Sequence, residues 1–138
     1  MAQTYRLDII TPERQFYSGM VEELVVDSPR GKMGVLAGHV PMVAAVSIGT
    51  IDIRDSEGRR LQCFTSDGFM EIRPGEVVVM AQTVEWPEEI DERRATEARV
   101  KAEEHLRQKH SIHEYQIASA SLARAMARLR VRRSVNID

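Results

Sequence analysis

The chain has 138 residues, a formal net charge of −2 and one cysteine. This length fits one domain, or a small domain with an appendage, and the near-neutral charge disfavours a dedicated nucleic-acid-binding protein. A single cysteine excludes an internal disulfide and fits a reducing compartment. We expect no signal peptide and no direct membrane insertion, because no run approaches the roughly 18 apolar residues of a membrane span.

Short apolar runs fill the chain from Tyr5 to about Val84. Residues such as Ile51 and Ile53 alternate with polar neighbours, which is typical of strands with one buried face. Turn signals rich in Gly, Pro, Asp and Ser separate the runs and leave no room for an ordinary helix. The pattern predicts a β-sandwich or flattened barrel. The continuously apolar stretch 77–80 predicts a strand that is buried on both faces or central in the sheet.

Residues 31–41 hold three glycines, a histidine and a proline between two apolar runs, and they predict a chain that turns sharply twice. His39 invites a catalytic or metal-binding interpretation, but no other ligand stands at suitable spacing, so a structural role is favoured. Three acids, Asp8, Asp27 and Asp52, are expected to be solvated rather than catalytic. No phosphate-binding loop or nucleophile elbow is present, so we predict no catalytic residue and no metal site.

The composition changes after Trp86 and Pro87, where glycine disappears and acids crowd the next few positions. Acids in a first helical turn complement the helix dipole. Small apolar residues then recur at helical spacing, namely Ala95, Ala98, Ala102 and Leu106. Lys109 and His110 are expected to close this first helix.

The stretch 111–114 is a capping-box pattern that predicts the start of a second helix. Its expected apolar stripe is Tyr115, Ala118, Leu122, Ala125 and Leu129. The chain is therefore predicted to fold as an N-terminal antiparallel β-sandwich (1–86) followed by a C-terminal antiparallel two-helix hairpin (87–138). The helices are built from strong helix formers, but an alanine-lined seam buries little area. Two alternatives stay open: a hairpin that opens while it remains helical, and one that is permanently docked.

Five arginines crowd the end of the second predicted helix, with no acid among them. They are Arg124, Arg128, Arg130, Arg132 and Arg133. Arg124 and Arg128 are four positions apart and share one face. The cluster predicts either a solvated basic face or a surface for an acidic protein partner or a phosphate group.

Several motifs together resemble the epsilon subunits of bacterial F-type ATP synthases. They are Gly31-x-x-Gly34-x-Leu36-x-Gly38-His39-x-Pro41, and the stretches 66–72, 77–81, 90–95 and 122–129. The resemblance runs nearly from end to end. Two positions depart from the family pattern. Asp67 stands where many members have a second glycine, and Lys32 stands where some members have an acidic residue.

The resemblance implies a non-catalytic rotor subunit, peripheral on the cytoplasmic face of the cell membrane, that couples the gamma subunit to the c-subunit ring. Arg30, Gly31, Lys32 and His39 are then expected near the gamma and c-ring junction. The helical domain of such subunits folds against the sandwich or extends and inhibits ATP hydrolysis. The five arginines of the predicted second helix are then expected to contact the beta subunit of the alpha/beta catalytic head.

The resemblance also implies a regulatory ATP site, with no cofactor required for the subunit itself. Its expected residues are Glu85, Ile90, Asp91, Arg94, Ala95, Arg124 and Arg128. Lys101 stands where nucleotide-binding members can have arginine. Two other functions are alternatives: a free-standing β-sandwich ligand-binding module with a helical tail, and a nucleic-acid module, which the low aromatic content disfavours.

Overall fold

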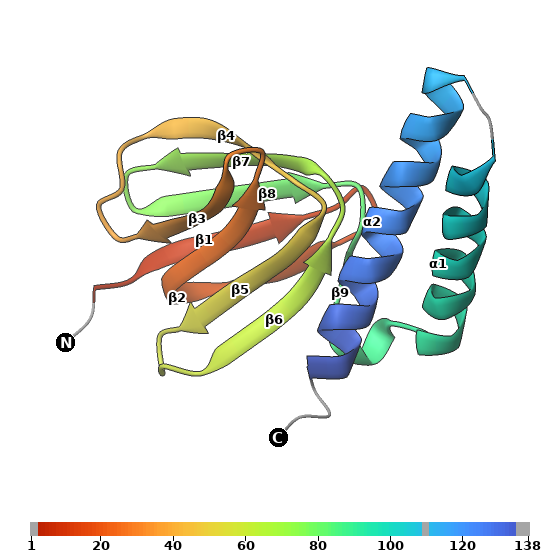
Figure 1. Ribbon diagram of the computed structural model, residues 1–138. Helices are drawn as coiled ribbons and strands as arrows, with labels where there is room; N and C mark the ends of the chain where they lie inside the picture. The colour runs from red at the N-terminus through yellow and green to blue at the C-terminus, as the bar shows by residue number, and fades with distance from the viewer. Residues whose placement is uncertain (1–2, 109–110, 135–138) are drawn as a thin grey trace.

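The computed structural model describes residues 3–108 and 111–134, and it consists of a β-sandwich with two helices at one end (Figure 1). This confirms the predicted fold class. The strands are β1 (Tyr5–Ile10), β2 (Gln15–Ser28), β3 (Gly31–Leu36), β4 (Met42–Val46), β5 (Gly49–Asp55), β6 (Arg60–Thr65), β7 (Gly68–Arg73), β8 (Glu76–Ala81) and β9 (Val84–Glu85). The helical elements are the short 3₁₀ turn η1 (Pro87–Glu89), α1 (Glu92–Arg107) and α2 (Ile112–Ser134).

The strands form one sheet with the order β4-β7-β8-β1-β2-β5-β6-β9, and β3 pairs with β2 outside this path. All pairs are antiparallel except β1 with β8, which run parallel from Arg6 opposite Glu76 to Ile10 opposite Met80. The prediction of an antiparallel sandwich therefore holds for every strand pair except this one. The parallel pair arises because β1 lies between its hairpin partner β2 and a strand that is far along the chain.

Alternating side chains of the strands fill the core between the two layers, as the sequence pattern predicted. In β8, Val77 and Val79 are buried, whereas Met80 is 41% exposed on the opposite face. The expectation that this strand is buried on both faces is wrong, and its central place between β7 and β1 is right. No other part of the described chain covers the outer face of β8, which therefore presents apolar side chains to solvent.

The helices form a hairpin in which α2 lies between the sandwich and α1 (Figure 1). Asp91 caps α1 by accepting a hydrogen bond from the N–H of Arg94, and Ser111 Oγ accepts from the N–H of Glu114 at 3.2 Å. The described part of α1 ends at Arg107, so the predicted closing residues 109 and 110 lie outside the described residues. Neither helix, over the residues that are described, combines the length and apolarity needed to cross a bilayer.

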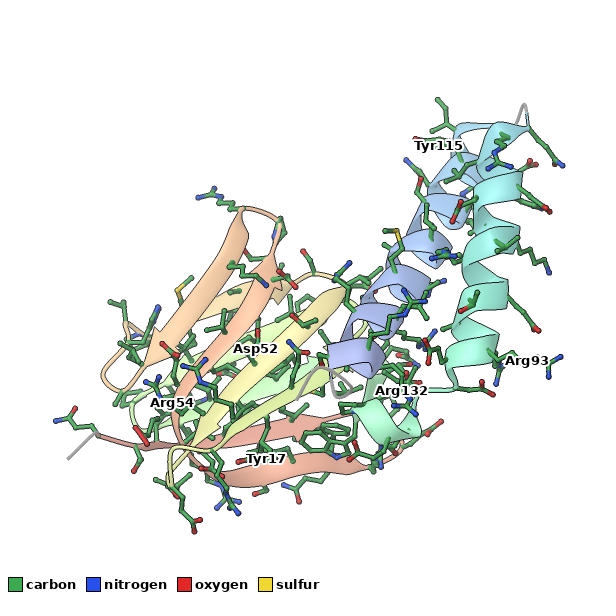
Figure 2. The ribbon with its side chains drawn as sticks, turned by 60° about the horizontal axis from the view of Figure 1, so that its bottom comes forward. Tyr17, Asp52, Arg54, Arg93, Tyr115 and Arg132 are labelled. Carbon is green, nitrogen blue, oxygen red and sulfur yellow. The ribbon has the colours of Figure 1, made fainter. Side chains whose placement is uncertain are left out.

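Most of the predicted helical stripe is at least partly buried, but two members are exposed. Ala98 is exposed and lines a hollow between the sandwich and the helices. Tyr115 is 55% exposed because the first turns of α2 extend past the sandwich, as Figure 2 shows at the far end of the hairpin.

A second, small apolar cluster joins α2 to the end of the sandwich. Ala127 and Val131 of α2 pack with Phe64 of β6 and Ile90, and Ile48 lies against them. Ala127 and Val131 lie outside the predicted apolar stripe, which has one face, whereas α2 has two apolar faces. The helix is thus held on one side by α1 and on the other by the sandwich.

Candidate functional site

A hollow of about 400 Å³ lies where β9, η1, the start of α1 and the C-terminal half of α2 meet. Six of the seven residues expected at an ATP site line it, together with Glu89 and Ala98. The six are Glu85, Ile90, Asp91, Arg94, Ala95 and Arg128. The seventh, Arg124, is not among the lining residues, and its guanidinium instead donates to Ser121 Oγ at 3.2 Å. The structure therefore brings together expected residues from β9, α1 and α2, which the sequence separates by up to 43 positions.

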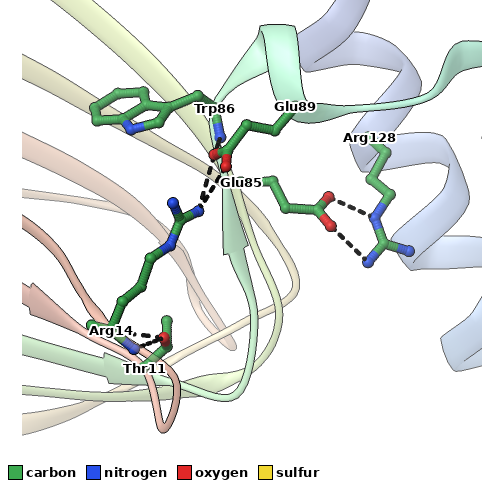
Figure 3. Close-up of polar contacts among 6 residues, drawn as sticks. All are labelled: Thr11, Arg14, Glu85, Trp86, Glu89 and Arg128. Atoms are coloured by element: carbon green, nitrogen blue, oxygen red, sulfur yellow. Dashed lines mark hydrogen bonds and ion pairs between the residues drawn. The ribbon is translucent and has the colours of Figure 1, made fainter.

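Arg128 is already bound within the hollow. Its Nε donates to Glu85 Oε1 at 2.8 Å and its Nη2 donates to Glu85 Oε2 at 3.4 Å (Figure 3). The guanidinium also lies over the ring of Phe64, 4.5 Å from the ring centroid. Both charged side chains are largely shielded from solvent, with 29% of Arg128 and 25% of Glu85 exposed. This pair is therefore screened less by water than an ordinary surface ion pair.

Glu89 fixes η1 against the sandwich on the other side of the hollow (Figure 3). Arg14 Nη2 donates to both of its carboxylate oxygens, at 2.9 and 2.8 Å, and the N–H of Trp86 donates to Oε1 at 2.8 Å. The bond from Arg14 lowers the pKa of Glu89 and outweighs the opposing effect of burial. Trp86 in turn stacks on Phe16, with ring centroids 4.4 Å apart. The junction between sandwich and helices is thus held rigidly up to Glu89.

Three carboxylates and two guanidiniums line the hollow. Two of the carboxylates already have partners: Glu89 is bound to Arg14, and Asp91 caps α1. Arginine forks suit phosphate oxygens, and carboxylates suit exocyclic amino groups or hydroxyls. Within residues 3–108 and 111–134, no group of three or more His, Cys, Asp or Glu side chains could hold a metal. The arrangement can bind a polar ligand, but it offers no activated nucleophile.

The five arginines of α2 do not form one free patch. Arg128 is paired with Glu85, and Arg133 Nε donates to Glu92 Oε1 of α1 at 3.1 Å. Arg130 is exposed. Arg132 is half-buried and lies near the C-terminal end of α2 (Figure 2). Two of the arginines expected to contact a partner therefore have carboxylate partners within the chain itself.

The other expected contact residues lie at opposite ends of β3. Arg30 lies in the turn between β2 and β3, and Gly31 is the first residue of β3, with a φ of 112° that favours glycine. Lys32 extends its ammonium group to Asp27 Oδ1 at 3.0 Å. His39 follows the other end of β3, and its Nδ1 lies 2.8 Å from the carbonyl oxygen of Val40. The structure separates the turn from His39 by the length of one strand.

The sequence patterns did not predict one feature of the structure, which is an apolar patch on the outer face of β4, β7, β8 and β1. The ladders place Phe69 beside Met80, and Met80 beside Ile10. These side chains are 61%, 41% and 39% exposed, and Val43 on neighbouring β4 is 68% exposed. The signal that could have revealed it is the unbroken apolar run of β8, which we had attributed to burial within the chain. A patch of this kind marks an interaction surface.

Comparison with known proteins agrees with this division of the chain. A family model described as the beta-sandwich domain of the ATP synthase delta/epsilon chain matches residues 4–87, and the long alpha-helix domain of the same chain matches residues 88–132. A protein named ATP synthase epsilon chain, from Caldanaerobacter subterraneus subsp. tengcongensis, is 43% identical over 132 residues, which are 95% of each chain.

Two solved structures share the fold. A chain of the Euglena gracilis mitochondrial ATP synthase (OSCP/F1/c-ring) has a TM-score of 0.80 at 21% identity, with 90% of this chain and 78% of that chain covered. A chain of the central stalk/c-ring of the Tetrahymena thermophila mitochondrial ATP synthase has a TM-score of 0.66 at 8% identity, covering 95% and 98%.

A sandwich followed by a helical hairpin, matched over nearly its whole length, places the chain in the delta/epsilon family of ATP synthase subunits. Within that family it is an epsilon subunit of the bacterial type, and hence a non-catalytic part of the ATP synthase, as the sequence motifs predicted.

Proposed function

We propose that this subunit joins the gamma subunit to the c ring through its sandwich and restrains ATP hydrolysis through α2. The observation that carries the proposal is the way α2 is docked. Its contact with the sandwich consists of a small apolar cluster and few polar bonds near its C-terminal end. Such a helix can leave the sandwich without unfolding the main core, and its arginines are then free for the beta subunit of the catalytic head.

The gamma subunit is the partner we assign to the apolar patch of Val43, Phe69, Met80 and Ile10, and the c ring is the partner we assign to the ends of β3 at Arg30–Lys32 and His39. A non-spanning subunit held in this way lies at the cytoplasmic face of the membrane as a peripheral component. Phe69→Asp should abolish capture of purified gamma subunit. The control is Ile112→Asp, which places the same charge at an even more exposed apolar residue outside the patch (79% exposed against 61% for Phe69). Retained capture by Phe69→Asp would contradict the assignment of this patch.

The inhibitory role is tested in the assembled enzyme. Arg124→Ala together with Arg128→Ala should raise the rate of ATP hydrolysis toward that of enzyme lacking residues 87–138, with assembly intact, because charge-assisted contacts to the beta subunit are lost. Arg93→Ala, on the solvent side of α1, is the control, since its side chain is 90% exposed. If deletion of the helices activates the enzyme but the arginine substitutions do not, these two arginines do not carry the inhibition.

We further propose ATP as a regulatory ligand of the hollow, a second function favoured by the six expected residues that line it. A nucleotide there would touch both α1 and α2 and would stabilise the docked hairpin. A ligand that binds only the docked state at a hundredfold excess over Kd contributes about 2.7 kcal/mol to that state. ATP would thus oppose inhibition, and falling ATP would restore it.

Calorimetric titration of the isolated subunit with ATP tests this second function. Arg94→Ala should weaken binding, because its guanidinium is a candidate phosphate contact at the edge of the hollow. Arg107→Ala, at the other end of α1, is the matched control. Absence of heat at millimolar ATP, or equal binding by Arg94→Ala and the control, would contradict a nucleotide site here.

A further inference from the structure

The contact between Glu85 and Arg128 differs in charge from the other hydrogen bond that joins α2 to the strands. Over the described residues, the hydrogen bonds between α2 and the strands are those of Arg128 with Glu85 and of Ser134 with Gln62. Only the first joins two opposite charges. Among the described residues, the docked state of α2 therefore depends on one hydrogen-bonded ion pair with the sandwich, in addition to the apolar cluster and the longer-range attraction between Arg130 and Asp27 of β2.

Glu85 belongs to the rigid side of this contact. It lies in β9, opposite Phe64 in the ladder with β6, and it immediately precedes Trp86, which is stacked on Phe16. The carboxylate and the ring of Phe64 together form a cradle that receives the guanidinium from two sides. This cradle stays on the sandwich when α2 leaves it.

Arg128 cannot serve two carboxylates in the same geometry. Both its Nε and its Nη2 donate to Glu85, and its face is covered by Phe64. An acidic segment of another subunit would need the same forked donors. We infer that Glu85 is an intramolecular competitor for Arg128, and that its hold on this arginine sets how readily α2 becomes available to the catalytic head. The inference deepens the proposed inhibitory function and rests on it.

The competition is possible because neither Glu85 nor Arg128 becomes a buried, unpaired charge when α2 leaves the sandwich. Glu85 and Arg128 both keep about a quarter of their side-chain surface exposed while paired, so water reaches each of them as the helix departs. A fully buried pair would instead leave an uncompensated charge and would lock the helix in place. The partial exposure therefore suits a contact that is made and broken repeatedly.

The test on the isolated, full-length subunit measures amide hydrogen exchange of residues 125–131 in α2. Glu85→Gln should speed their exchange roughly three- to tenfold, because the charge-assisted bond is weakened at a partly exposed site. The matched control is Glu71→Gln, which removes the same charge from the pair with Arg73 on the sandwich (2.8 Å). The charge swap Glu85→Arg with Arg128→Glu should restore slow exchange. Equal exchange in Glu85→Gln and Glu71→Gln would overturn the inference.

The same variants in the assembled enzyme separate the inference from the function on which it rests. Glu85→Gln should lower ATP hydrolysis, because more α2 is released to inhibit, whereas the swap should not inhibit, because α2 then carries a glutamate at position 128. If deletion of the helices activates the enzyme while Glu85→Gln leaves hydrolysis unchanged, the competition is refuted. If the deletion itself has no effect, the inhibitory function fails, while faster exchange in Glu85→Gln still establishes its hold on α2.

Discussion

At the scale of single residues, Asp27 connects three segments of the sandwich. Its carboxylate accepts from Lys32 Nζ and from the N–H of Thr50, each at 3.0 Å, and its backbone oxygen accepts from the N–H of Ser47. Burial alone would raise the pKa of Asp27, but the bonds from Thr50 and Lys32 hold it below the usual range. The sequence suggested only a solvated acid here, because bonds to distant backbone leave no trace in local patterning.

We expect Asp27→Asn to lower the free energy of unfolding by about 1 kcal/mol at neutral pH, since bonds to a charged, partly exposed acceptor are weakened. A carboxyl with a depressed folded-state pKa stabilises the protein above its unfolded pKa, near 4. That contribution disappears as the pH falls through the folded-state pKa. Denaturant titrations from pH 7 to pH 2 should therefore show the two proteins converging at low pH, and a constant difference would contradict this account.

Gly68 illustrates a different constraint, which comes from space rather than charge. A Cβ at this position would lie against the backbone of Met80 and Ala81, including 2.9 Å from the Cα of Ala81, and a paired strand cannot move aside easily. Gly68→Ala should therefore cost about 2 kcal/mol or more of unfolding free energy. Gly34→Ala is the control, because nothing lies within 4 Å of its added Cβ. Equal thermal midpoints for the two variants would refute the steric argument.

At the scale of elements, α2 shows which features of a helix can be predicted from one sequence and which cannot. Its start, its end region and the seam residues Ala118, Ala125 and Leu129 could be predicted from caps and periodicity. Its second apolar face could not, because Ala127 and Val131 become core residues only through contact with the sandwich. The hollow was anticipated through family motifs rather than through spacing, since its residues meet only after α2 has docked.

Val131→Ala should loosen this docking selectively. Removal of buried methyl groups costs about 1 to 2 kcal/mol at a site of this kind, and here the cost falls on the contact between α2 and Phe64. We expect faster amide exchange in α2 and unchanged exchange in β1 and β8. Val100→Ala is the matched control on α1, because Val100 is 45% exposed. Uniformly faster exchange throughout the chain would mean that the hairpin and the sandwich unfold as one unit.

At the scale of the whole molecule, the sandwich core and the docking cluster share no residue, either among their buried members or among the partly buried side chains packed against them. This supports the proposed division into residues 1–86 and 87–138. The apolar patch could not be assigned from the sequence, because apolar residues that await another subunit look the same as residues that await the core.

Residues 1–86 alone should therefore unfold cooperatively. The single tryptophan, Trp86, stacks on Phe16 and reports on the core edge through its fluorescence. A sigmoidal denaturant transition of this fluorescence, with no binding of a hydrophobic dye beforehand, is the expected result. A broad, dye-binding transition would show instead that the sandwich requires its helices. Phe64→Ser in the same fragment offers a form without the exposed docking ring.

The parallel pairing of β1 with β8 has a further consequence for folding during synthesis. On the ribosome, β1 and β2 emerge early and can form their hairpin, yet the other edge of β1 waits until β8 has been synthesised. Pairing at long range is slow compared with the local contacts of the helices, which follow last. The nascent sandwich thus carries an open strand edge through most of its synthesis. Pairing of that edge with β8, rather than formation of the β1–β2 hairpin, should therefore limit the rate at which the chain is protected from aggregation.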